Sequence, residues 1–207
     1  AELPTDHVIA CPRVADHVDT LDVDARALVD GIDQRDLMLF AIAISARAQA
    51  ISEVFQHAGL KAPVLDNIRA EIWLKLWGNV CFNPISALSH STLVDICQYP
   101  LARELAADMM LEAQAVAAKL GISFRVTLDR RIEGAEKVGK HKTSMLQDVE
   151  AGRGPEIDAL VGSVVELGKL TGTPTPHIDS AYALVKLLER TMTEEHGGVK
   201  MHKTVPA

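Results

Sequence analysis

Apolar side chains recur every three or four positions over most of the chain after residue 45, and this pattern predicts a mainly helical protein. The first predicted helix covers 45–57, with Ser45 as its N-cap and Gly59 as its stop. A second helix begins after Asn67, and we expect Pro84 to kink it because proline lacks the backbone N–H. Its apolar positions are Ile68, Ile72, Trp73, Leu76 and Val80.

The remaining chain predicts four further helices, and a loop with a short helix, separated by glycine and proline. A long helix runs from Pro100 to Leu120 and is closed by Gly121. Residues 121–140 are expected to form a loop with a short helix. Three more helices are predicted at Ser144–Glu150, Pro155–Leu170 and His177–Arg190.

The segment before Asn67 differs in character from the rest. Leu37–Ile44 is an apolar run that could be a buried strand, and Lys61–Leu65 is a short extended piece after a helix. These pieces predict an α/β remnant of a dinucleotide-binding domain over 1–66, followed by an all-helical domain over 67–207 that carries the substrate and catalytic residues. The Asp-rich residues 6–36 predict neither helix nor strand, and their role stays open.

Charge and composition narrow the choice of partners. The 207 residues carry a formal net charge of −7, which disfavours nucleic acid or an anionic membrane as partner. The longest apolar run has eight residues, against about 20 for a membrane span. The three cysteines form no C-x-x-C, and no signal peptide is visible, so we expect reduced thiols and a cytoplasmic protein.

Several familiar site motifs are absent from the sequence. It contains neither a G-x-G-x-x-G nor a G-x-x-x-x-G-K-[ST] loop for phosphate, and no G-x-S-x-G for a hydrolase. His196 and His202 come nearest to metal-ligand spacing, in a polar tail that is better explained as solvated. We therefore predict no metal site.

The stretch after Asn67 carries the first candidate site. Lys75, Asn79 and Asn83 are four residues apart in succession, so on a helix they share one face. One ammonium and two amides suit a small anionic ligand rich in oxygen. A solvated polar face is the simpler explanation when this stripe is taken alone.

A second candidate stretch follows near residue 144. Ser144 with Gln147 three positions later matches a capping box, which would explain both residues structurally. Glu156 follows Pro155 in the first turn of a predicted helix, where the helix dipole favours an acid.

Taken together, the two stretches resemble the ketopantoate reductase (2-dehydropantoate 2-reductase) family. The pattern K-L-x-x-N-x-x-x-N-P is followed by S-M-L-Q-D and by a glutamate twelve positions after the serine, and the likeness runs from Ile51 to Leu188. The family joins a Rossmann domain that binds NADPH to a helical domain, and it reduces ketopantoate to pantoate in pantothenate and coenzyme A synthesis.

The resemblance implies a role for each matching residue. Lys75 resembles the general acid of the family by its position in the pattern. Asn79, Asn83 and Ser144 resemble the family's substrate ligands, and Ser144 matches the one that binds the substrate carboxylate. Glu156 is similar to the residue that engages the cofactor ribose and helps to position Lys75. Asp148 lies nearby in the pattern and carries less weight. These roles imply NADP as cofactor, a 2-keto acid as small-molecule partner, and a homodimer as an open alternative.

The sequence departs from the family pattern in two places. The glycine-rich loop is expected upstream of Ala1, so we expect the chain to be the C-terminal part of such an enzyme. A further substrate contact would fall near Leu93, which cannot make that hydrogen bond. Two alternatives stay open: a reductase of another 2-keto acid, and a non-catalytic module that binds a ligand or oligomerises through the apolar stripe of Pro100–Leu120.

Overall fold

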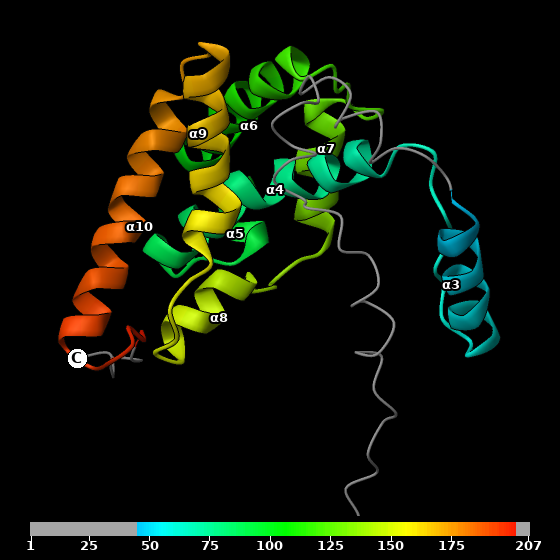
Figure 1. The fold of residues 1–207 in the computed structure, drawn as a ribbon. Coiled ribbons are helices and arrows are strands. Elements are labelled where there is room, and N and C mark those ends of the chain that lie inside the picture. The colour runs from blue at the N-terminus through cyan, green and yellow to red at the C-terminus, as the bar shows by residue number, and fades with distance from the viewer. Residues whose placement is uncertain (1–44, 202–207) are drawn as a thin grey trace, which may run out of the picture. The chain divides into compact units, whose positions relative to one another are not determined.

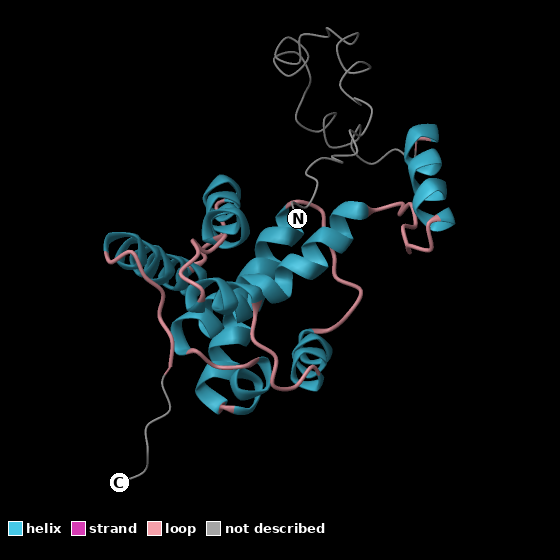
Figure 2. Cartoon of the chain, turned by 90° about the horizontal axis from the view of Figure 1, so that it is seen from below, coloured by secondary structure: helices cyan, strands magenta, loops and turns pink. Residues whose placement is uncertain are grey.

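A computed structural model describes residues 45–201, and every regular element in that range is a helix (Figures 1 and 2). The chain divides into two compact units, Ala1–Asp66 and Asn67–Ala207. The expected strand at Leu37–Ile44 and the Asp-rich segment lie outside the described residues. That the first unit is a remnant of a dinucleotide-binding domain stays a prediction.

The described part of the first unit contains helix α3 (Ala46–His57) and a loop. The Ser45 hydroxyl accepts a hydrogen bond from the Ala48 N–H at 3.1 Å, and Gly59 has a φ of 79°, so both predicted helix ends are confirmed. The expected extended piece at Lys61–Leu65 forms no strand. A strand needs a neighbouring strand to pair its backbone, and residues 45–201 supply none.

Helix α4 (Ile68–Ser89) is the central element of the second unit. The Asn67 side chain caps it by accepting from the Ala70 N–H at 3.1 Å, as predicted. The helix continues through Pro84 to Ser89. It packs against α6 (Pro100–Lys119), α8 (Ser144–Glu150) and α10 (Pro176–Glu194). Helix α4 therefore borders most of the core.

The indole of Trp77 fixes α4 within that core. Trp77 is fully buried, its ring stacks on Phe124 with the centroids 4.2 Å apart, and its Nε1–H donates to the Met110 carbonyl of α6 at 2.6 Å. A carbonyl oxygen has two lone pairs, so Met110 can accept this bond and still serve its own helix. Trp77 thus sets both the depth of α4 and its position along α6.

Helix α5 (Leu93–Gln98) is an element that the hydrophobic pattern did not predict. It has six residues, too few for a helical period to show. Its start is fixed by Asp95, whose carboxylate accepts from the Thr92 N–H at 3.0 Å. Helix α7 (Leu128–Lys137) is the short helix expected within 121–140, and it packs against α5 and α6.

The segment after Pro155 corrects the predicted regular helix. Residues Asp158–Gly162 form a π-helical turn, and α9 (Ser163–Thr171) continues from it. A Cβ at Gly162 would lie 3.1 Å from the Tyr182 ring of α10, so the glycine allows the two elements to approach closely. The sequence gives no periodic signal for a single π turn, which adds one residue to an otherwise helical pattern.

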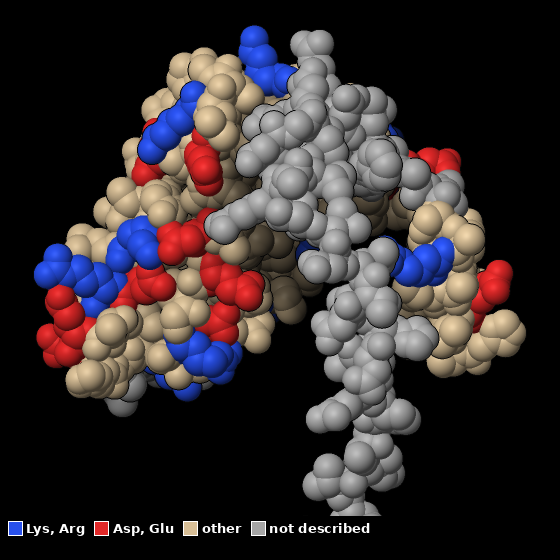
Figure 3. Space-filling model, viewed as in Figure 1, with Lys and Arg blue, Asp and Glu red and all other residues tan. Residues whose placement is uncertain are grey.

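Two side chains of α10 hold the π turn. The Tyr182 hydroxyl donates to Asp158 Oδ1 at 2.6 Å, and Lys186 Nζ lies 2.9 Å from Asp158 Oδ2. These contacts hold the pKa of Asp158 below its usual range, the tyrosine hydrogen bond being the larger influence. Figure 3 shows charges of both signs interleaved over α9, α10 and the turn after α8.

The long helix α6 confirms its predicted range, with Gly121 at a φ of 74° beyond its end. Its apolar stripe is divided, because Met109 and Val116 are fully buried in the core while Leu101 is 66% exposed. Within residues 45–201, no helix has both the length and the apolar character that crossing a membrane requires.

The described cysteines, Cys81 and Cys97, are buried free thiols. Burial raises the pKa of Cys81 to about 12 and that of Cys97 to about 11, so both are inert thiols at neutral pH.

We expect Trp77→Phe to lower the free energy of unfolding by about 2 kcal/mol, because it removes a buried hydrogen bond and part of the packed ring. Urea unfolding measures this change. Trp73→Phe is the matched control, since the Trp73 indole makes no hydrogen bond within 45–201 and the ring is 8% exposed. Equal losses for the two variants would contradict the anchoring role of Trp77.

We expect Asp158→Asn to destabilise the protein near neutral pH and to have no effect in strong acid. The folded pKa of Asp158 lies below its unfolded value of about 3.8, so its stabilisation is present above that value and is lost as the pH falls through the folded pKa. Urea unfolding at pH 7 and at pH 2.5 tests this. A difference between the variant and the wild type that is the same at both pH values would contradict it.

Candidate functional site

A cavity of about 890 Å³ opens in the second unit and is walled by α4, α5, α7, the start of α8 and the π turn. All five residues singled out from the sequence line it, although they come from three separate segments. They are Lys75, Asn79, Asn83, Ser144 and Glu156.

Helix α4 contributes a polar stripe that runs from the surface into the cavity. Lys75 is exposed, Asn79 is half-buried and Asn83 is 5% exposed. Burial therefore increases with each turn of the helix along this face. The Nδ2 of Asn83 is buried and has no hydrogen-bond partner among the described residues. Leaving such a donor unpaired costs about 1–3 kcal/mol, so this position calls for a ligand oxygen or a water.

The structure corrects the capping box expected at Ser144. The cap of α8 is Thr143, whose hydroxyl accepts from the Leu146 N–H at 3.2 Å. The Gln147 amide donates to the Lys142 carbonyl at 3.0 Å instead of closing a box. The Ser144 hydroxyl is exposed, lines the cavity and makes no hydrogen bond within 45–201, so its residue type is not explained by capping.

Glu156 lies just before the π turn, not in the first turn of a regular helix. Its side chain is exposed and lines the cavity. Glu156, expected to help position Lys75, forms no ion pair with it, because these two described side chains make no contact within 4.0 Å. Their carboxylate and ammonium groups are therefore both available to a ligand.

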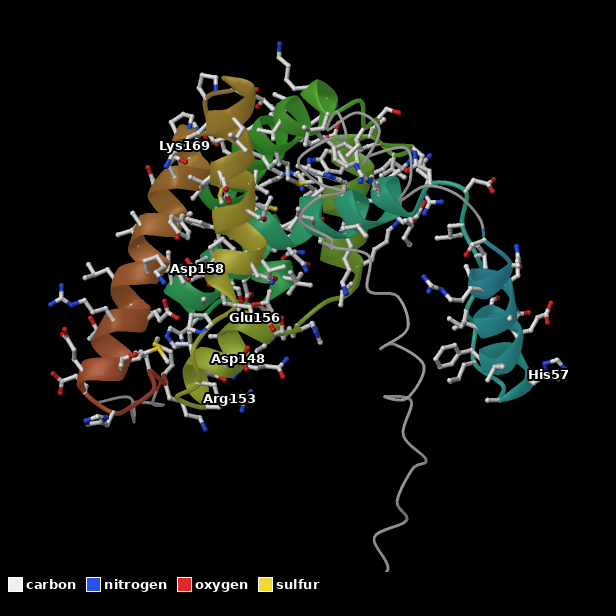
Figure 4. The ribbon with its side chains drawn as sticks, viewed as in Figure 1. His57, Asp148, Arg153, Glu156, Asp158 and Lys169 are labelled. Carbon is white, nitrogen blue, oxygen red and sulfur yellow. The ribbon has the colours of Figure 1, made fainter. Side chains whose placement is uncertain are left out.

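Asp148 does not belong to the cavity. Its carboxylate pairs with the Arg153 guanidinium, with Nε at 2.8 Å and Nη2 at 2.6 Å from the same oxygen. Figure 4 shows both residues at the end of α8, beside the turn that leads to Glu156. Asp148 thus pairs with the turn that leads to Glu156 and takes no part in the cavity.

Four polar residues of the cavity wall were not singled out from the sequence: Arg131, His141, Thr143 and Ser163. Arg131 comes from α7, where it shares a face with Ala135 and Val138, which also line the cavity. The helical spacing of these three residues is a signal that could have found this wall within the segment expected to be mostly loop. Leu93 also lines the cavity, as an apolar contact.

The charges of the lining suit an anion. Lys75 and Arg131 are cationic, Glu156 is the one carboxylate among the lining residues, and His141 is a further titratable group. Within residues 45–201, no three His, Cys, Asp or Glu side chains cluster in a way that could hold a metal ion.

Comparison with known proteins connects this helical unit to one family. The family model described as ketopantoate reductase PanE/ApbA C terminal matches residues 67–189. A 2-dehydropantoate 2-reductase from Mesorhizobium japonicum is 52% identical over 170 residues, which are 81% of this chain and 52% of that protein. The chain spans about half the length of the curated relatives it matches.

Solved structures agree with the sequence match. The 2-dehydropantoate 2-reductase from Methylococcus capsulatus superposes with a TM-score of 0.69 at 32% identity, over 74% of this chain and 50% of that one. A D-mandelate dehydrogenase solved with NADH and anilino(oxo)acetate superposes with a TM-score of 0.65 at 26% identity, over 72% of this chain and 63% of that one.

The capping assignment predicts opposite outcomes for two neighbouring substitutions. Thr143→Ala should lower the free energy of unfolding by about 1 kcal/mol, because it removes the N-cap of α8. Ser144→Ala should leave stability within about 0.5 kcal/mol of wild type, as for other exposed positions. Urea unfolding compares the two variants, and a larger loss for Ser144→Ala would return the capping role to Ser144.

Proposed function

The chain belongs to the ketopantoate reductase family, and we propose that it forms the substrate-binding and proton-donating part of a 2-dehydropantoate 2-reductase. That enzyme reduces ketopantoate to pantoate with NADPH, in pantothenate biosynthesis. One observation carries the proposal: Lys75, Asn79, Asn83, Ser144 and Glu156 line a single cavity although they come from three separate segments of the chain.

Lys75 is proposed as the general acid. Reduction of a ketone leaves negative charge on its oxygen, and an ammonium within hydrogen-bond reach stabilises that charge and then supplies the proton. Lys75 stands on a helix whose other face is anchored by the buried Trp77, so its backbone is held rigidly beside the cavity. Its exposed side chain makes no ion pair within 45–201, which leaves the ammonium free to engage the substrate.

The amide and hydroxyl groups are proposed to orient the substrate. The buried Asn83 Nδ2 lacks a protein partner and is suited to donate to a substrate oxygen. Asn79 adds a second amide one turn nearer the surface, and the Ser144 hydroxyl reaches the cavity from α8. Neutral donors bind oxygen atoms without adding a cation to compete with Lys75.

Glu156 is proposed to bind the cofactor. Its exposed carboxylate lacks a partner within 45–201 and can accept hydrogen bonds from the ribose hydroxyls of a nicotinamide nucleotide. The bound NADPH would supply the hydride. The 207 residues contain no glycine-rich phosphate loop, so Glu156 is the one cofactor contact that we assign to this chain.

A second candidate keeps the chemistry and changes the substrate to another 2-keto acid. Leu93 favours it, because an apolar side chain lines the cavity where the family resemblance implies a polar contact. The non-catalytic oligomerisation module is weaker, since much of the α6 stripe is buried in the unit itself. A homodimer and a cytoplasmic location remain predictions.

The proposal is tested by calorimetric binding of ketopantoate and by ketopantoate-dependent oxidation of NADPH. We expect Lys75→Met to lower kcat by at least about 100-fold, the usual contribution of a general acid, with an unchanged urea midpoint. Lys169→Met is the matched control: this lysine is exposed on α9, lies outside the cavity (Figure 4) and should have no effect.

Normal turnover by Lys75→Met would contradict the assignment of the acid. Ketopantoate binding without oxidation of NADPH would support the substrate role and separate it from catalysis. Failure to bind ketopantoate, with binding of another 2-keto acid, would favour the second candidate.

A further inference from the structure

Arg131 occupies a position that the assigned roles leave unexplained. It lies in α7, and its guanidinium packs on the α4 backbone at Gly78. Gly78 directly precedes Asn79 and follows Lys75 by three residues, and all of them line the cavity. A Cβ at Gly78 would come within 2.8 Å of the Arg131 Cζ and closer still to Nη2. The guanidinium therefore occupies space that any side chain at position 78 would fill.

Gly78 has an energetic cost that this packing explains. A glycine inside a helix is about 1 kcal/mol less favourable than alanine. Gly78 is buried in the middle of α4 and has ordinary helical geometry, so no turn requires it. The close approach of the Arg131 guanidinium is the contact that a Cβ at position 78 would displace.

Among the described residues, no carboxylate pairs with Arg131. Arg125 pairs with Glu71 and Arg153 pairs with Asp148, whereas the Arg131 guanidinium makes no ion pair or side-chain hydrogen bond with any residue of 45–201. It is half-buried and lines the same cavity as Asn83 and Ser144. A half-buried guanidinium with open donors beside a cavity is a site for an anion.

We propose that Arg131 binds the carboxylate of the 2-oxo acid and so selects acids over neutral ketones. This inference rests on the proposed function. A planar guanidinium matches a carboxylate with two parallel hydrogen bonds, which an ammonium or a hydroxyl cannot supply. With Arg131 on the carboxylate, Lys75 is left for the ketone oxygen, and the two cations of the cavity serve two adjacent polar groups of one substrate. Gly78 supports this arrangement by admitting the guanidinium.

The test compares ketopantoate with its lactone, which keeps the ketone and has no free carboxylate. Calorimetry on the full chain measures the Kd of both compounds. We expect Arg131→Met to weaken ketopantoate binding by about 10–100-fold, the range of a charge-assisted hydrogen bond, and to leave lactone binding unchanged. Arg131→Lys should weaken ketopantoate binding less than Arg131→Met does, because lysine keeps the positive charge although it lacks the planar guanidinium.

Two further variants separate binding from structure. Gly78→Ala should also weaken ketopantoate binding selectively, since its Cβ displaces the guanidinium while Arg131 itself is retained. Arg130→Met is the matched control, because this neighbouring arginine is exposed and lies outside the cavity. It should bind both compounds as the wild type does.

Each remaining outcome overturns the inference. An Arg131→Met variant that binds ketopantoate normally refutes the carboxylate role while the proposed function stands. An equal loss for ketopantoate and lactone shows a structural role for Arg131 in place of carboxylate recognition. A wild-type chain that binds no 2-oxo acid refutes the proposed function and this inference together.

Discussion

The hydrogen bond and ring stack of Trp77 form the constraint on which the candidate site depends. Trp77 is two residues from both Lys75 and Asn79, so on a helix it points roughly 200° away from them. The hydrogen bond of its indole to Met110 and its stack on Phe124 fix the position of α4 relative to the core, and with it the position of the opposite face of the helix. The core thus positions the face of α4 that carries Lys75 and Asn79.

Several polar groups of the cavity, unlike the Trp77 indole, have no hydrogen-bond partner among the described residues. In a core built for stability alone, a buried amide would be paired, yet the Asn83 Nδ2 has no partner among the described residues. Ser144 and Arg131 also have side-chain donors without partners within 45–201. In contrast, the carboxylates of Asp148 and Asp158 are paired with side chains of the protein and belong to the scaffold. Unused hydrogen-bonding capacity, more than residue type, marks the site.

The sequence predicted those helix ends that are determined by residues close to them in the chain. The caps at Ser45 and Asn67 and the ends of α6 follow from side chains close in sequence, and the structure confirms them. The helix α5 was missed because six residues show no period, and the π turn was missed because its contacts come from α10. Thr143 took the cap expected of Ser144, since adjacent hydroxyl residues compete for one role.

The residues of the candidate site also differ in whether the local sequence could predict them. Lys75, Asn79 and Asn83 were predicted as one face because a helix fixes their relation, while Ser144 and Glu156 joined them through family resemblance. Arg131 was predicted by neither, because its position depends on how closely α7 approaches Gly78 of α4. A tertiary contact of this kind leaves one trace in the sequence, a glycine where a helix disfavours it. That trace gains meaning only when the opposite helix is seen.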